Sequence, residues 1–326
     1  MKTLSNLSQG YKSVRAAGRL VVFLYLVNLA FSLVLAVPMY EAIADSLGRS
    51  QAGERMARGF DYQWWEEFRD QGHGLATTYG PSVFGRGALL NNLEGLVGMR
   101  LGTLPSSVLL TLIIYIIVHT FLAGGILGSY AQESPGFNLR GFLGEATRYF
   151  PRFLGLMIFS WVFFYAVGFV LNARLSALLE RVSHHALTER TPFFAGLAVS
   201  LIVWVLMMFI QMVFDYARIR TVMTGRANIF RAAWEGLALV LRHPLATFGL
   251  YYLLFIMTAI VSVAYVLLKE TIVQRAAAGV LLAFVLQQLF ILALVGMRCW
   301  TYAGQLHLMR GFEGRSISNS VIKGLG

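Results

Sequence analysis

Among the polar side chains inside long apolar stretches of the sequence, where a hydrogen-bonding group needs a partner, four are the main candidates. They are Asn28, His119, Gln287 and Gln288. A polar or ionisable residue within a membrane-spanning segment is costly to bury, so it is a functional candidate by default. His119 has the broadest chemistry, because an imidazole can ligate a haem or chlorin, relay a proton or bind a quinone.

His119 also has a simpler interpretation, in which a neutral imidazole hydrogen-bonds to a neighbouring helix, for example to Asn28 at a similar depth. A b-type haem usually takes two axial ligands, and no second histidine lies in the middle of an apolar stretch. His119 is therefore the candidate cofactor-binding residue, although we expect no cofactor.

Gln287 and Gln288 are adjacent on one predicted helix, so their side chains point about 100° apart. At most one of them faces a given neighbour. One glutamine would join two helices, whereas both together would line a polar cavity. Gly124 and Gly128 form a GxxxG pattern, which lets another backbone approach closely. The partner of these glycines lies either within the chain or in a second subunit.

Other charged residues give weaker signals. Asp215 and Arg218 lie three residues apart at the end of an apolar stretch, which is typical of an ion pair at a membrane edge. Glu66, Asp70 and His73 share a helix face, but a solvated face explains them better than a cation does, so we expect no metal site. The sequence contains no GxSxG, Walker A, HExxH or kinase-like motif, so we do not expect an enzyme.

The elements that must hold these side chains are long apolar runs. Of the 326 residues, 57% are hydrophobic and 13% charged, whereas a soluble domain has about 25% charged residues. Six runs are long enough to cross a bilayer as helices: 20–40, 106–129, 153–172, 193–214, 245–268 and 277–298. The strand alternation of a membrane barrel is absent. The predicted fold class is an all-α integral membrane protein with six transmembrane helices.

Charge decides the predicted orientation. With the N-terminus inside, the inside segments hold 16 basic and 5 acidic residues, and the outside segments hold 11 of each. The positive-inside rule therefore places both termini in the cytoplasm of a bacterial inner membrane. Because the basic residues flank apolar runs, the net charge of +11 indicates anionic lipid as a partner rather than nucleic acid.

The whole chain, 1–326, is predicted to form one transmembrane domain with a periplasmic cap loop at 41–104. Within this loop, 61–70 is predicted to form a short helix. A piece of this size buries little core of its own, so we interpret it as a cap on the membrane domain.

A parallel repeat of three hairpins is a further hypothesis. Tyr-Ala pairs end three predicted helices, at positions 130, 216 and 302, always 86 residues apart. After the first two pairs comes a basic, amphipathic stretch that fits a cytoplasmic interfacial helix, and then a proline, Pro151 or Pro244, that opens the next run. The alternative is coincidence, combined with the preference of tyrosine for membrane interfaces.

From 121–125 to Pro151, and again from 231–233 to Pro244, the chain resembles a broad group of uncharacterised bacterial membrane proteins. It is also similar to the non-catalytic membrane domain of some glycerophosphodiester phosphodiesterases. The likeness covers 107–268 and rests on helix spacing and on small and aromatic residues. It implies a six-helix membrane module with interfacial helices. It carries over no catalytic residue, because the catalytic barrel of those enzymes is absent.

These observations favour a non-catalytic scaffold or accessory subunit that binds lipids and other membrane protein subunits. A transporter or lipid-handling protein is the first alternative, and a polar cavity lined by Asn28, His119 and Gln287 would support it. A cofactor- or pigment-binding electron-transfer subunit that uses His119 is the second alternative.

Overall fold

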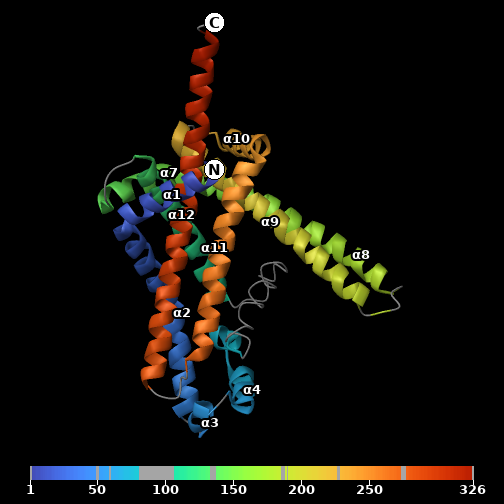
Figure 1. The fold of residues 1–326 in the computed structure, drawn as a ribbon. Coiled ribbons are helices and arrows are strands. Elements are labelled where there is room, and N and C mark those ends of the chain that lie inside the picture. The colour runs from blue at the N-terminus through green and yellow to red at the C-terminus, as the bar shows by residue number, and fades with distance from the viewer. Residues whose placement is uncertain are drawn as a thin grey trace. The chain divides into compact units, whose positions relative to one another are not determined.

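The computed structural model describes residues 2–48, 51–58, 60–80, 106–132, 137–184, 188, 190–225, 228–272 and 277–324, and these residues contain no strand. The elements, most of which are labelled in Figure 1, are α1 (Lys2–Ala16), α2 (Gly18–Gly48), α3 (Ala52–Arg58), α4 (Tyr62–Gln71), the 3-10 helix η1 (Gly74–Thr78), α6 (Ser106–Ala131), α7 (Leu139–Tyr165), the π-helix η4 (Ala166–Leu171), α8 (Asn172–His184), α9 (Arg190–Thr224), α10 (Ile229–Arg242), α11 (Pro244–Thr271) and α12 (Ala277–Gly324).

Within the described residues, six helical segments are long and apolar enough to cross a membrane: α2, α6, the continuous segment from α7 into α8, α9, α11 and α12. The prediction of an all-α protein with six such helices is confirmed at this level. Each helix also extends beyond its apolar run. α2 continues to Gly48, so it takes up the first residues of the predicted cap loop.

The two prolines of the repeat hypothesis differ in their surroundings. Pro244 is the first residue of α11, as predicted, where its missing N–H costs nothing. Pro151 lies inside α7, so the prediction that it opens a helix is wrong. Phe153 and Leu156 follow it and are completely buried, and this packing holds α7 together across the lost hydrogen bond.

The chain divides into two compact units, and four of the helices contribute residues to both. The first unit consists of residues 1–21, 119–258 and 296–326, and the second consists of 22–118 and 259–295.

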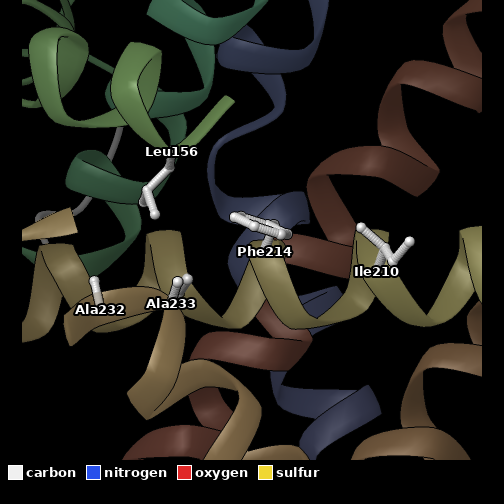
Figure 2. Close-up of a cluster of buried hydrophobic side chains, with 6 residues drawn as sticks. Leu156, Ile210, Phe214, Ala232 and Ala233 are labelled. Carbon is white, nitrogen blue, oxygen red and sulfur yellow. The ribbon is translucent and has the colours of Figure 1, made fainter. Parts of the chain in front are cut away.

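The first unit is built on close helix crossings. Leu156, Ile210, Phe214, Ala217, Ala232 and Ala233 form a buried cluster where α7, α9 and α10 meet (Figure 2). The two alanines give α10 a flat face, so its backbone lies against α9. A Cβ atom added at Gly236 would lie 2.8 Å from the carbonyl oxygen of Val213. Only glycine fits at this crossing.

Two further crossings of the first unit also depend on glycine. The early part of α7 packs on α6, where a Cβ atom at Gly124 would lie 3.2 Å from the carbonyl oxygen of Ala146. The GxxxG pattern that includes Gly128 therefore has its partner within the chain. α1 packs on α12, where a Cβ atom at Gly10 would lie 2.8 Å from the backbone nitrogen of Gly304.

The second unit contains a small aromatic core over the end of α2. The predicted helix at 61–70 is confirmed as α4, with the Asp61 side chain accepting a hydrogen bond from the backbone N–H of Trp64 as its N-cap. Trp64 and Phe68 are buried with Ala52 and Ala76. The indole N–H of Trp64 donates to Ser46 Oγ at 3.1 Å. Residues 81–104 of the predicted cap lie outside the described residues.

Candidate functional site

A cavity of about 470 Å³ lies in the second unit between α2, α6 and α12. Its volume falls within the range of about 300–1,000 Å³ that is common for small-molecule sites. The cavity is lined by Tyr25, Asn28, Leu29, Phe31, Ser32, Leu35, Val108, Thr111, Leu112, Tyr115, Gln288 and Ile291. All of these described lining residues are uncharged at neutral pH.

Two side-chain hydrogen bonds cross the cavity wall from helix to helix. The Tyr25 hydroxyl of α2 donates to Gln288 Oε1 of α12 at 2.8 Å. The Tyr115 hydroxyl of α6 donates to Asn28 Oδ1 of α2 at 3.0 Å. These two pairs tie the three helices together and fix the orientation of both amides, which suits a preformed site.

Most of the remaining polar groups in the wall are satisfied by their own helix. Asn28 Nδ2 donates to the carbonyl oxygen of Leu24 at 2.8 Å. The hydroxyls of Ser32 and Thr111 donate to carbonyl oxygens one turn earlier, at 2.8 and 2.9 Å. The wall is therefore chiefly apolar, with two amide–tyrosine pairs as its polar features.

The sequence-predicted polar residues divide between the two units. Asn28 and Gln288 line the cavity together. Gln287 is exposed, because the helix turns it away from the face that carries Gln288. His119 is half-buried and belongs to the first unit, one turn after Tyr115 on α6. Of the three residues that would support a transporter, Asn28 lines the cavity, whereas Gln287 of the same unit is exposed.

The side-chain amide of Asn28 has hydrogen-bond partners within the second unit, and a bond between His119 and Asn28 stays a hypothesis. Asn28 uses its amide oxygen for Tyr115 and its amide nitrogen for Leu24. Cofactor binding by His119 stays an untested alternative, and the described part of α6 contains no second histidine.

Sequence reasoning missed Tyr25 and Tyr115. Tyrosine is common at the interfaces of membrane proteins with water, so neither residue type stands out as a candidate for a site. A signal was present, because Tyr25 and Asn28 are three residues apart and therefore share one face of α2. Which helix that face meets is information that the sequence pattern does not contain.

No group of three or more metal-ligating side chains occurs in the part of the chain that the structure describes. The face of Glu66, Asp70 and His73 has other contacts. Asp70 pairs with Arg69 at 3.2 Å. His73 Nδ1 lies 2.9 Å from the carbonyl oxygen of Gly72.

A second polar site lies in the first unit and is centred on Asp215, which is completely buried. The sequence predicted its pairing with Arg218, and the structure shows this pair at 3.1 Å. It also adds two donors that the sequence did not indicate, Gln211 from the same helix at 3.0 Å and Arg298 from α12 at 3.4 Å.

In the part of the chain that the structure describes, six helices long and apolar enough to cross a membrane, together with a chiefly apolar cavity, indicate the class of multi-pass helical membrane proteins. No family model, curated protein or solved structure matches the chain. The resemblance to the membrane domain of glycerophosphodiester phosphodiesterases therefore stays a prediction.

Proposed function

We propose that the protein is a non-enzymatic lipid-handling membrane protein, which holds part of an amphiphilic molecule from the bilayer between α2, α6 and α12. The observation that carries this proposal is the cavity of about 470 Å³ with its two amide–tyrosine pairs. An apolar cavity with a few fixed polar groups is the common form of a small-molecule site.

The polar pairs, rather than the apolar wall, would select the ligand. Moving an acyl chain from the bilayer into an apolar cavity gains little hydrophobic free energy, because lipid tails are already as apolar as leucine. A hydroxyl or carbonyl group on the ligand would instead gain hydrogen bonds from Tyr25 and Gln288 or from Tyr115 and Asn28. Each such bond contributes about 1 kcal/mol.

The test is to fill the cavity and to identify the bound molecule. The full chain is purified in mild detergent, and the molecules that accompany it are measured by mass spectrometry. Thr111→Phe places a ring in the cavity and is expected to displace the bound amphiphile. Ile114→Phe is the matched control, because Ile114 lies on the same helix and its side chain is 44% exposed.

Loss of the molecule in Thr111→Phe alone supports the proposal. A chain that carries no specific molecule, or that carries the same molecule in both variants, contradicts it.

A scaffold or accessory subunit is the second candidate, and the α8–α9 hairpin favours it. These two helices pack on each other (Figure 1). Near the start of α9, large apolar side chains point away from the chain: Phe193, Phe194, Leu197 and Leu201 are 57–67% exposed. Another membrane subunit would cover this face. Crosslinking from Leu197→Cys to a second protein is the expected result, and a protein that runs only as a monomer after gentle extraction contradicts this candidate.

We also propose that the three helix crossings of the first unit are copies of one unit in a parallel repeat. In each crossing a short helical segment packs on a longer helix through glycine: α7 on α6, α10 on α9, and α1 on α12. The three tyrosines of the Tyr-Ala pairs, Tyr130, Tyr216 and Tyr302, are all buried. If Gly10 and Gly236 hold equivalent positions, Gly10→Leu and Gly236→Leu should lower thermal stability equally, and unequal losses contradict the repeat.

The membrane location and orientation belong to the same proposal: a bacterial inner membrane, both termini cytoplasmic, and interfacial helices among lipid headgroups. The exposed side chains of α10 support the interfacial role. Phe230, Trp234 and Leu241 are 63–69% exposed along one side, whereas Gly236 and Val240 are buried. Such an outward apolar stripe suits the boundary between headgroups and acyl chains. Labelling of Trp234→Cys from the periplasmic side would contradict the orientation.

A further inference from the structure

The Asp215 site of the first unit has more positive than negative charge. Asp215 Oδ1 accepts hydrogen bonds from Gln211 Nε2 at 3.0 Å, Arg218 Nη1 at 3.1 Å and Arg298 Nη2 at 3.4 Å. One carboxylate thus faces two guanidinium groups, and the site has a net charge of +1. A single positive charge without a counter-charge is costly in a membrane-spanning segment.

The unbalanced charge is on Arg298. The side chains of Asp215 and Arg218 are 0% and 11% exposed, whereas that of Arg298 is 44% exposed. Arg298 lies in the segment of α12, Ala277–Phe312, that is apolar enough to cross a membrane. With this helix spanning a bilayer, the accessible part of Arg298 would lie among bilayer components.

Among the described residues, the hydrogen bonds of the Arg298 guanidinium group are all made by one nitrogen, Nη2. Nη2 bonds to Asp215 and also donates to the Tyr302 hydroxyl at 2.8 Å. The guanidinium carbon lies 4.5 Å from the centre of the Tyr302 ring. In the part of the chain that the structure describes, Nη1 and Nε have no hydrogen-bond partner, so their N–H groups are available to a ligand.

An arginine in this state is suited to a phosphate group. Guanidinium presents planar pairs of N–H donors that match two phosphate oxygens, and charge-assisted hydrogen bonds of this kind are about twice as strong as neutral ones. Asp215 and Tyr302 fix the plane in advance, so less conformational entropy is lost on binding. A phosphate also supplies the negative charge that the site lacks.

We propose that Arg298, oriented by Asp215 and Tyr302, binds a phosphate group, and that the phosphate of a membrane phospholipid is its source. This proposal rests on residues other than those that line the α2–α6–α12 cavity. Its test therefore does not depend on whether the cavity is occupied. Free inorganic phosphate has the same chemistry, so the experiment distinguishes the two sources.

The experiment measures lipid binding to the full chain by native mass spectrometry. Phosphatidylglycerol is compared with diacylglycerol of the same acyl chains, so that only the phosphate-containing headgroup differs. The natural chain should prefer phosphatidylglycerol at least about tenfold, the effect expected of one charge-assisted hydrogen bond. Arg298→Gln should abolish this preference. In this variant Asp215 keeps Arg218 and Gln211 as partners, which favours retention of the fold.

Arg69→Gln is the matched control. Arg69 is 45% exposed, pairs with Asp70 at 3.2 Å and lies 4.8 Å from the Trp65 ring centre, so it resembles Arg298 in exposure and stacking but belongs to a balanced ion pair. This variant should keep the preference. Arg298→Lys keeps the charge without the planar donors, so it should show an intermediate preference for phosphatidylglycerol. This variant still tests the site if Arg298→Gln misfolds.

The outcomes separate the alternatives. Inorganic phosphate that displaces phosphatidylglycerol at millimolar concentration, with a dependence on Arg298, assigns the site to phosphate from solution as well. Failure of inorganic phosphate to compete assigns it to the lipid alone. A phosphatidylglycerol preference that persists in both Arg298→Gln and Arg298→Lys, or equal binding of diacylglycerol by the natural chain, overturns the proposal.

Discussion

The two units of the chain use side-chain volume in opposite ways. Where α10 crosses α9 in the first unit, even one added carbon at Gly236 would lie 2.8 Å from a backbone oxygen. Between α2, α6 and α12 in the second unit, about 470 Å³ stays open. The first unit also buries a charged carboxylate, Asp215, whereas the described wall of the cavity has no charge.

This difference indicates a division of roles. Helices in a bilayer associate through close packing and hydrogen bonds, because lipid removes the usual hydrophobic driving force between them. The first unit has these features in abundance, which suits a rigid framework. The second unit leaves space and places two polar pairs around it, which suits the reception of a ligand. Variants in both units test whether the first is closely packed and the second is open.

The largest effect is expected from Asp215→Ala. Removing this carboxylate leaves Arg218, with a side chain that is 11% exposed, without its partner. Breaking a buried ion pair from one side costs about 3–5 kcal/mol. Thermal unfolding in detergent should show a large loss of stability. Asp61→Ala, in the cap, should not produce a comparable loss, and an unchanged stability of Asp215→Ala would contradict a structural role for the buried carboxylate.

A smaller but still large effect is expected from Gly236→Leu. Its side chain would meet the backbone of Val213 and Ala217, which do not yield without separating α10 from α9. Overpacking of this kind costs about 1–3 kcal/mol and occasionally more. Gly249→Leu is the control, because a Cβ atom at Gly249 meets nothing within 4 Å. If Gly236→Leu is as stable as Gly249→Leu, the α9–α10 crossing is looser than the structure indicates.

A matched pair of leucines compares the two units directly. Leu156 is completely buried in the first unit, whereas Leu112 lines the cavity of the second. Leu156→Ala leaves a new void and should cost about 2 kcal/mol or more. Leu112→Ala only enlarges an existing space, so it loses fewer contacts and should cost about half as much. Equal losses of thermal stability would remove the packing difference on which the comparison rests.

The smallest effect concerns the aromatic core around α4, which is the described part of the predicted cap. The hydrogen bond from Arg55 to Asp61, together with the N–H of Trp64, holds the pKa of the Asp61 carboxyl below its usual value. A depressed carboxyl pKa stabilises the folded cap above about pH 4, and this contribution is lost as pH falls through the folded-state pKa. Tryptophan fluorescence should show a loosening of the cap at acid pH.

Asp61→Asn provides the control for this titration. Asparagine caps a helix about as well as aspartate does but has no carboxyl to protonate. The acid transition should therefore be flattened in this variant. A transition of the same size in both proteins would mean that another group controls the acid sensitivity of the cap.

The sequence predicted the local features of the site better than its assembly. The rule that Gln287 and Gln288 face different neighbours follows from helix geometry, and the structure agrees, with Gln288 in the wall and Gln287 exposed. The suggested bond between His119 and Asn28 stays a hypothesis, because depth along two helices does not determine their relative rotation. The structure shows that Tyr115, one turn before His119, donates to Asn28.

Hydropathy and helix periodicity are properties of neighbouring residues, so the sequence by itself determined the helical class, the six apolar helices, the cap helix α4 and the Asp215–Arg218 pair within one helix. Only the tertiary structure decided that Arg298 joins this pair, that the glycines of α6 meet α7, and that Tyr25 and Gln288 enclose a cavity. Each of these contacts joins residues far apart in the chain, and it depends on the rotation and depth at which two helices pack, which a one-dimensional pattern does not encode.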